Sequence, residues 1–220
     1  MEVEYKDHMG NDLSVANAAR VSFGKQTKSL EIYPATIDGH LVTIPFTNVK
    51  DRHLIEYLAK HDHWTPFAHT SITFYIKSPI FIARQLGKHQ VGLVWNEISR
   101  RYVSSEPEFY LPQEWRLAAE DKKQGSLDET IEYDDAIQVQ EIALQHYQSM
   151  LEKGIAPEQA RMVLPQSTYT EWYWTGSLYA FARVCKLRLQ PDAQKETRYI
   201  AQLISDRCDQ LFPISWAVLL

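Results

Sequence analysis

Residues 70–87 read TSITFYIKSPIFIARQLG, and this stretch predicts a strand that leads directly into a helix. From Thr70 to Lys77, apolar residues occupy every second position between Ile72 and Ile76, which is the period of a strand with one buried face. Ser78-Pro79 then supplies an N-cap residue and a first-turn proline, and Gly87 is suited to end the helix. This strand and helix therefore anchor the predicted fold.

The rest of the chain continues this mixture of strands and helices. Further strands are predicted at residues 3–6 and 167–175, and Asp38-Gly39 is a turn signal for a hairpin within residues 28–48. Residues 105–127 carry turn and charge signals. Caps and helical spacing predict helices at 11–20, from 51 to 61–63, and at 128–153, 157–165, 176–186 and 192–211. Because strands and helices do not alternate as regular βαβ units, the predicted fold class is α+β.

Composition bounds the domain organisation and the class of partner. The chain has 220 residues, enough for a sizeable core, and no Gly/Ser/Pro-rich linker divides it, so residues 1–220 are predicted to form one domain. The formal net charge of -5 gives no basic field for nucleic acid, so any anion site must be local. No apolar run approaches the ~20 residues that a membrane span needs, and residues 1–7 have neither a basic n-region nor an apolar core, so we expect a cytoplasmic protein with no membrane partner.

Aromatic residues and histidines offer two further hypotheses. Aromatic residues make up 12% of the chain, and the run Glu171-Trp172-Tyr173-Trp174 is predicted to form subunit interface rather than core. His61, His63 and His69 supply metal-ligand types, but histidines two apart on a helix point in different directions and no cysteine joins them. No metal site is predicted, and these histidines are interpreted as residues of a helix end.

The candidate site lies in the segment from Arg84 to Tyr102, RQLGKHQVGLVWNEISRRY. Its first half places two polar pairs at a spacing of four, Arg84 with Lys88 and Gln85 with His89. Such pairs share neighbouring faces of a helix. Its second half offers two guanidinium groups and a hydroxyl beside a carboxylate, a set suited to a phosphomonoester and an adjoining polar ring. A solvated helix face with surface ion pairs is the alternative interpretation of the same charges.

This segment resembles the signature of the flavin-dependent thymidylate synthases, Arg-His-Arg followed after a short spacer by Asn-Glu-x-Ser-x-Arg-Tyr. Here it reads Lys88-His89-Gln90 and then Asn96-Glu97-Ile98-Ser99-Arg100-Arg101-Tyr102. Both flanking arginines of the triplet are replaced, and the spacer is one residue longer than usual. Four other stretches match family elements in the same order: Ala18 to Ser22, His63 to His69, Ala160 to Pro165 and Leu187 to Glu196. The resemblance therefore covers nearly the whole chain.

The resemblance implies an FAD-dependent thymidylate synthase, which methylates dUMP to dTMP with 5,10-methylenetetrahydrofolate and NADPH as cosubstrates. It implies an antiparallel-rich sheet flanked by helices, in a homotetramer whose protomers share each site, with Lys88 and His89 meeting C-terminal residues of a neighbour. No Gly-x-Gly-x-x-Gly element occurs, so FAD would not bind in Rossmann fashion. Two alternatives stay open: transfer of another one-carbon group, such as hydroxymethyl, to a pyrimidine nucleotide, and a nucleotide-binding protein without catalysis.

The resemblance also implies residue roles. Arg188 contacts the uracil, where a fixed guanidinium would stabilise charge on a carbonyl oxygen, and Arg188 and Ser99 are the predicted catalytic residues. The residues implied for nucleotide binding are Gln85, Glu97, Ser99, Arg101, Arg161 and Arg188. Those implied for FAD are Ser22, Thr65, Lys88, His89, Gln90, Asn96 and Arg183. One cofactor contact is missing, because Ala68 stands where the family often has a glutamate.

Cysteine usage agrees with the flavin-dependent class. Cys185 and Cys208 are the only cysteines, too few for a disulfide framework, and both fall among apolar residues at helical spacing. We expect buried, inert thiols. The classical thymidylate synthases activate uracil with a cysteine thiolate, and neither residue has a setting suited to that role.

Overall fold

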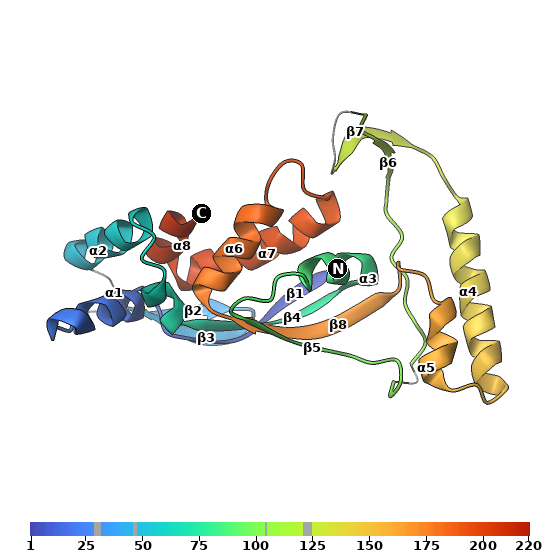
Figure 1. The fold of residues 1–220 in the computed structure, drawn as a ribbon, viewed down its shortest axis with the longest axis horizontal. Helices are drawn as coiled ribbons and strands as arrows, with labels where there is room; N and C mark the ends of the chain where they lie inside the picture. Colours follow the sequence, from blue (N-terminus) through green and yellow to red (C-terminus); the bar gives the residue numbers. More distant parts are fainter. Residues whose placement is uncertain (29–31, 46–47, 104, 121–124) are drawn as a thin grey trace.

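The chain folds around a four-stranded antiparallel sheet that carries helices on one face (Figure 1). The computed structural model describes residues 1–28, 32–45, 48–103, 105–120 and 125–220. Its strands are β1 (Glu2–Met9), β2 (Ile32–Ile37), β3 (His40–Pro45), β4 (Ser71–Pro79), β5 (Leu93–Glu97), β6 (Trp115–Ala118), β7 (Ser126–Ile131) and β8 (Tyr169–Gly176). Its α-helices are α1 (Asp12–Arg20), α2 (Val49–Lys60), α3 (Ile80–Leu86), α4 (Asp135–Glu152), α5 (Pro157–Ala160), α6 (Leu178–Arg188), α7 (Lys195–Leu211) and α8 (Pro213–Leu219). Short 3₁₀ turns are η1 (Val21–Phe23), η2 (Thr65–His69) and η3 (Arg161–Val163). The predicted α+β class and antiparallel sheet are confirmed.

The strand predicted at residues 70–77 lies inside the sheet as β4. The strand order is β1-β4-β8-β5, and each neighbouring pair is antiparallel. Side chains from Ile72 to Ile76 at alternate positions are fully buried on the face that α3, α6 and α7 cover in Figure 1. The opposite face carries polar side chains, such as the Thr73 and Thr175 hydroxyls, whose oxygens are 2.9 Å apart. The alternation in the sequence therefore separates a core face from a polar face.

The two tryptophans of β8 belong to the core, so the prediction that this run forms subunit interface is wrong for them. Trp172 and Trp174 are 1% and 0% exposed. Trp95 of β5 stacks on Trp172 with ring centroids 4.2 Å apart, and Phe181 of α6 meets Trp174 edge-on at 5.4 Å. Tyr173 between them is 47% exposed on the other face of the sheet. Composition alone cannot separate the two faces, whereas the two-residue period of a strand does.

Two predictions fail where β4 leads into α3 and β5. β4 extends to Pro79, so Pro79 rather than Ser78 precedes the first helical turn, and Ser78 makes no cap bond to the helix. α3 ends at Leu86, so Lys88 and His89 follow the helix instead of continuing its faces. The edge strand β5 then forms at Leu93–Glu97, where no strand was predicted, because its short sequence shows no clear alternation.

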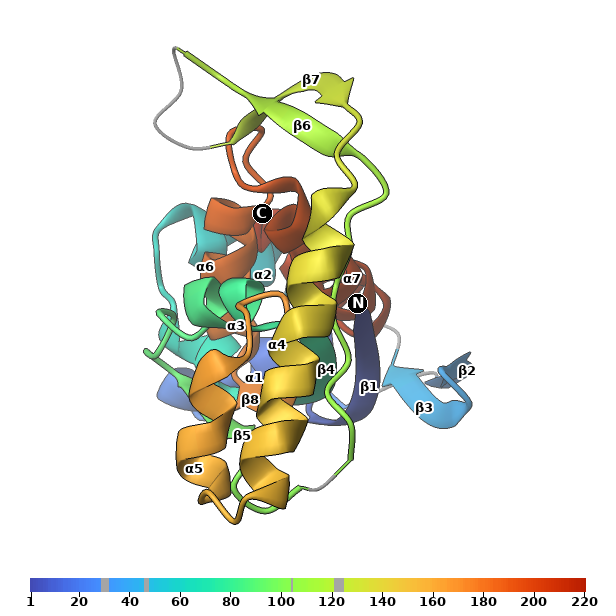
Figure 2. The same ribbon diagram turned by 90° about the vertical axis from the view of Figure 1, so that its right-hand side faces the viewer.

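The helix predicted at 128–153 is a strand followed by a shorter helix. β7 pairs with β6, and α4 begins only at Asp135. Residues 121–124 of the predicted turn region lie outside the described residues. Figure 2 shows the β6–β7 hairpin beyond one end of α4, and Figure 1 shows α4 standing beside the sheet. Three apolar side chains of α4, those of Ile137, Val139 and Ile142, are 44%, 58% and 55% exposed. The apolar spacing of α4 thus marks a surface that the described core does not cover.

The N-terminal part contains a hairpin and a buried ion pair. The hairpin predicted at Asp38-Gly39 is confirmed as the turn between β2 and β3, although residues 29–31 and 46–47 lie outside the described set. Asn11 caps α1, which lies within the helix predicted at 11–20, while α2 begins at Val49 rather than at Asp51. Asp51 is fully buried and accepts hydrogen bonds from Arg20 Nη2 at 2.6 Å and Nε at 2.9 Å.

Among the described residues, no helix has the length and apolar character that crossing a membrane requires.

Candidate active site

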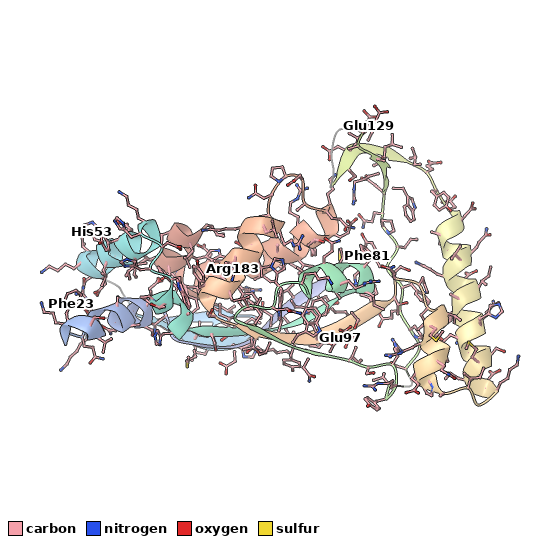
Figure 3. The ribbon with its side chains drawn as sticks, in the orientation of Figure 1. Phe23, His53, Phe81, Glu97, Glu129 and Arg183 are labelled. Carbon is pink, nitrogen blue, oxygen red and sulfur yellow. The ribbon has the colours of Figure 1, made fainter. Side chains whose placement is uncertain are left out.

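Several residues of the signature segment surround one cavity. The cavity has a volume of about 430 Å³ and lies between the end of α3, the loop 87–92, β5 and β8. Its lining includes four residues that the resemblance implies for substrate or cofactor: Lys88, His89, Gln90 and Glu97. Arg84, Trp95 and Trp174 complete much of the wall. Figure 3 shows Glu97 on β5 and Arg183 on α6, on either side of this region. We call this space the β5 cavity.

Arg188 contacts the wall of the β5 cavity through His89. Arg188 ends α6, where its Nε donates to Nε2 of His89 at 3.0 Å and its Nη2 donates to the carbonyl oxygen of Gln85 at 3.3 Å. Since a guanidinium group can only donate, Nε2 of His89 must be unprotonated. Burial, followed by the charges of Arg188 and Arg183, lowers the pKa of His89. A neutral imidazole therefore orients the guanidinium group.

The remaining part of Arg188 is available to a ligand. Within the described part of the chain, its Nη1 makes no hydrogen bond to another residue. Burial lowers the pKa of Arg188, but a guanidinium group stays protonated at neutral pH. Within this chain His89 contacts Arg188, and the expectation that His89 also meets C-terminal residues of a neighbouring protomer stays a prediction. Arg188 itself is not among the residues that line the β5 cavity, so it adjoins the cavity through His89, with its Nη1 unpaired among the described residues.

Gln85 is held by two residues that follow α6. Thr197 Oγ1 donates to Gln85 Oε1 at 3.2 Å, and Gln85 Nε2 donates to Gln194 Oε1 in a short contact. Thr197 is fully buried in α7, so its hydroxyl gives the Gln85 amide a fixed orientation. These bonds join α3 to α7 as the Arg188 bonds join α3 to α6. Two of the predicted nucleotide residues, Gln85 and Arg188, are therefore brought together.

Glu97 is held by one donor on each carboxylate oxygen. Thr170 Oγ1 donates to Oε1 at 2.5 Å, and Trp95 Nε1 donates to Oε2 at 3.1 Å. Thr170 lies on β8, next to β5 in the sheet, and is 5% exposed. Each carboxylate oxygen accepts one of these hydrogen bonds. Glu97 therefore presents a fixed negative group to the β5 cavity.

The predicted phosphate-binding residues lie elsewhere. Ser99 Oγ accepts from N and Nε of Arg101 at 3.3 and 3.2 Å. Arg161 of η3 donates to the carbonyl oxygen of Glu158 at 3.4 Å. No hydrogen bond or ion pair between described residues links these three side chains to Arg188. Figures 1 and 2 both show the loop after β5 beside α5, which precedes Arg161. The structure thus gathers the predicted nucleotide residues into two groups rather than one.

The predicted flavin residues also divide. A second cavity of about 620 Å³ is lined by Trp64, Gly92, Ser177, Tyr179 and Arg183, among others. The rings of Trp64 and Tyr179 are 5.8 Å apart, and both can stack on a flat ring. Lys88, His89 and Gln90 face the β5 cavity instead. Because the loop 87–92 borders both cavities, its residues and Arg183 lie near enough to each other to hold different parts of one large ligand.

Three predicted flavin residues lie outside both cavities. Thr65 is exposed and does not line the second cavity, although the residue before it, Trp64, does. Ser22 is exposed in η1 beside Phe23, which Figure 3 shows at the left end of the molecule, well away from Glu97. Asn96 pairs with Tyr173, on the face of the sheet opposite to Glu97. Within one chain, these three residues do not join Lys88 and His89.

The thiols and histidines were assigned non-catalytic roles. Cys185 and Cys208 are free and fully buried, as predicted, and burial raises the pKa of both thiols. A thiolate is therefore disfavoured at either position. His61 and His63 have ring centroids 6.2 Å apart at the end of α2. Across the described ranges, no group of three His, Cys, Asp or Glu side chains is arranged to hold a metal ion.

Sequence reasoning missed the residues that support the predicted ones. These are Trp95, Thr170, Trp174, Gln194 and Thr197. One signal was available for Thr170: it is a polar residue in the buried phase of an alternating strand, and a buried hydroxyl needs a partner. Gln194 and Thr197 contact Gln85, which lies 109 and 112 positions away, too far along the chain for a local pattern to reveal it.

Comparison with known proteins gives the family. The chain matches the family model described as thymidylate synthase complementing protein over residues 5–214. It is 38% identical over 219 residues to a flavin-dependent thymidylate synthase of Thermus thermophilus, covering 98% of this chain and 74% of the relative. A flavin-dependent thymidylate synthase of Treponema denticola is 36% identical over 220 residues, with 96% and 76% covered.

A solved structure gives the same relationship. The UMP/dUMP methylase PolB from Streptomyces cacaoi, bound with 5-Br dUMP, matches this chain with a TM-score of 0.80 and 31% identity, covering 99% of this chain and 93% of that one. The same methylase bound with 5-Br UMP matches with a TM-score of 0.77 and 30% identity. Since sequence and fold agree over nearly the whole length, this chain belongs to the thymidylate synthase complementing protein family, that of the flavin-dependent thymidylate synthases.

Proposed function

We propose that residues 1–220 form a single-domain, FAD-dependent thymidylate synthase, which converts dUMP to dTMP by reductive methylation with 5,10-methylenetetrahydrofolate and NADPH. One observation carries the proposal beyond family membership. Arg188, His89 and Gln85 are hydrogen-bonded together beside a cavity that Glu97 also lines. This arrangement provides a fixed cation, a fixed anion and a polar rim within one site.

The chemistry requires electron density at a uracil carbon that is not nucleophilic by itself. The free Nη1 of Arg188 would donate to a uracil carbonyl oxygen and stabilise the negative charge that develops there. His89 and the Gln85 carbonyl hold the guanidinium in advance, so little reorganisation is needed. Burial of Cys185 and Cys208 supports this electrostatic route over attack by a thiolate.

The remaining substrate residues would bind the nucleotide around this point. Ser99, also proposed as catalytic, would join Arg101 and Arg161 at the phosphate and ribose, because charged donors bind phosphate strongly. Gln85 and Glu97 would contact the nucleoside. In the single chain, the residues proposed to bind the phosphate are separate from Arg188, so the full nucleotide site needs either a loop movement or a second protomer.

FAD supplies the hydride when bound, and the residues around the loop 87–92 suit it. Lys88 and Arg183 provide positive charge for a pyrophosphate, with His89 and Gln90 as hydrogen-bonding partners. Trp64 and Tyr179 provide ring surfaces for stacking. Ser22, Thr65 and Asn96 remain proposed contacts, and their distance from Lys88 within one chain is a second reason to consider assembly.

We propose that the active form is a homotetramer with shared sites. The separated ligand groups and the exposed apolar side chains of α4 support this, since such surface is often covered by another subunit. FAD should then raise both the thermal stability and the tetramer fraction, because a ligand that binds only the assembled form shifts the equilibrium towards it. Analytical ultracentrifugation with and without FAD measures this. A monomer that binds FAD stoichiometrically would contradict shared sites.

Product analysis tests the proposed activity. The purified protein is supplied with FAD, NADPH, 5,10-methylenetetrahydrofolate and either dUMP or UMP, and the nucleotide product is identified by mass spectrometry. We expect dTMP from dUMP. UMP is included because PolB is described as a UMP/dUMP methylase. A hydroxymethyl product would favour the alternative one-carbon transfer, and a flavin-loaded protein that binds dUMP without converting it would overturn the proposal.

A further inference from the structure

We infer that Thr170 and Trp95 are positioning residues, which fix the Glu97 carboxylate so that it binds the nucleoside part of the substrate. The inference rests on the proposed function and deepens it. Neither residue lies in the signature motif, and neither was expected at the site. Their importance comes from geometry: each donates to a different oxygen of the same carboxylate.

Glu97 would be poorly ordered without these donors. It ends β5, which lies at the edge of the sheet and has β8 as its only neighbour among the described strands. A glutamate at such a position has free rotamers and open solvent nearby. A donor on Oε1 at 2.5 Å and a donor on Oε2 at 3.1 Å together fix both the direction and the plane of the carboxylate.

The two donors are themselves immobile. Thr170 lies on β8, which has neighbours on both sides, and its side chain is on the helix-covered face. The indole of Trp95 stacks on Trp172 at 4.2 Å with an interplanar angle of 16°, and it meets Trp174 edge-on at 5.6 Å. Since Trp172 and Trp174 are fully buried, this aromatic stack connects the position of Glu97 to the core.

The chemistry of a fixed carboxylate selects the part of the ligand. An ionised carboxylate only accepts hydrogen bonds, and it repels a phosphate. The complementary groups in a pyrimidine nucleotide are the ribose hydroxyls and the ring N–H. The Glu97 end of the β5 cavity is therefore assigned to the nucleoside, and the phosphate to the guanidinium groups beyond β5.

Four variants separate this role from a general effect on folding. Thr170→Val removes the hydroxyl at nearly constant volume, and Thr170→Ser retains it. Trp95→Phe removes the N–H and keeps a stacking ring. Thr73→Val is the matched control, because it removes a hydrogen-bonded threonine hydroxyl from the neighbouring strand on the opposite face of the sheet.

The measurement is the dUMP dissociation constant by calorimetry, with kcat and both KM values from steady-state assays. Thr170→Val should raise the dissociation constant and the KM for dUMP about tenfold, with the KM for the folate unchanged. Thr170→Ser should lie within about threefold of wild type, Trp95→Phe should show a smaller rise than Thr170→Val, and Thr73→Val should equal wild type. In a Glu97→Gln background, Thr170→Val should add much less, because both changes act on one interaction.

Three results would overturn the inference: wild-type dUMP binding in Thr170→Val, equal weakening in the Val and Ser variants, or full additivity with Glu97→Gln. If Thr170→Val does not fold, Trp95→Phe decides, and wild-type binding there counts against the inference.

Crystal structures without nucleotide test the geometry apart from the proposed function. Glu97 should leave its position in Thr170→Val and keep it in Thr170→Ser, even if the wild type makes no dTMP. An unmoved Glu97 in Thr170→Val refutes positioning.

Discussion

Replacing Arg188 with alanine tests the central element of the proposed chemistry, and the structure gives the size of the expected effects. The substitution removes two hydrogen bonds, from Nε to His89 at 3.0 Å and from Nη2 to the Gln85 carbonyl at 3.3 Å. It also removes the Nη1 edge that we propose for the uracil carbonyl. The first two interactions exist without substrate, whereas the third exists only in the complex.

The two sets of interactions predict different losses. Hydrogen bonds from charged donors contribute about 1.5–3 kcal/mol each. Because Arg188 is only half-buried, water can form some of the hydrogen bonds that the substitution removes, so we expect the free energy of unfolding to fall by about 1–3 kcal/mol in total. A domain with about 5–15 kcal/mol of stability remains folded after that loss. Removing one donor to a developing oxyanion lowers kcat by a factor of about 10²–10³, equivalent to about 2.7–4 kcal/mol.

The assay compares kcat for dTMP formation at saturating substrates and FAD with the thermal unfolding temperature of the same sample. Arg198→Ala is the control, because Arg198 also donates to two carbonyl groups, those of Pro191 and Ala193, at 3.0 Å each, but neither of these residues lines the β5 cavity, as His89 does. We expect both variants to lose stability and only Arg188→Ala to lose kcat. An Arg188→Ala variant that retains more than about a tenth of wild-type kcat would refute the transition-state role.

Three other predictions concern the phosphate, the thiols and pH. Arg101→Ala should weaken dUMP binding by about 2 kcal/mol or more, because a charge-assisted contact to phosphate is lost, and titration curves equal to those of wild type would exclude Arg101 from the site. A Cys185→Ala, Cys208→Ala double variant should make dTMP with a lower unfolding temperature from small cavities, whereas a folded, flavin-loaded but inactive variant would restore a thiolate mechanism. Folding lowers the pKa of His89, so as the pH falls below about 6.5 the unfolded chain binds a proton before the folded chain does, and folding stability decreases. Below the pKa of the folded state, Nε2 of His89 is protonated and cannot accept the hydrogen bond from Arg188. kcat/KM should therefore fall at acid pH, and His89→Gln, which accepts without titrating, should flatten that limb; an unchanged acid limb would contradict the assignment.

Patterns that act over a few residues were predicted correctly from the sequence. The two-residue period identified β4, the Asp38-Gly39 turn identified the β2–β3 hairpin, and a cap signal near residue 11 identified the start of α1. Each depends on contacts within one strand, turn or helical end, so neighbouring residues specify it. The family motifs located Lys88, His89, Gln90 and Glu97, which the structure places around the β5 cavity, and their roles there stay predictions.

Errors arose where long-range packing outweighed local pattern. β5 forms because its backbone pairs with β8, and the sequence of residues 93–97 alone does not indicate this pairing. Residues 126–131 pair with β6 instead of starting a helix, because strand pairing can override helical spacing. The tryptophans of β8 were assigned to an interface since composition does not reveal which face of a strand is covered.

By itself, the sequence determined the α+β class and which residues are proposed for the site, because period, caps and motifs are local properties of the chain. Only the tertiary structure decided which residues meet. His89 and Arg188 are 99 positions apart, and Glu97 and Thr170 are 73 apart, yet each pair is joined by one hydrogen bond. A hydrogen bond needs its two atoms within about 3 Å, and only the packing of α6 on the sheet and of β8 beside β5 brings them that close.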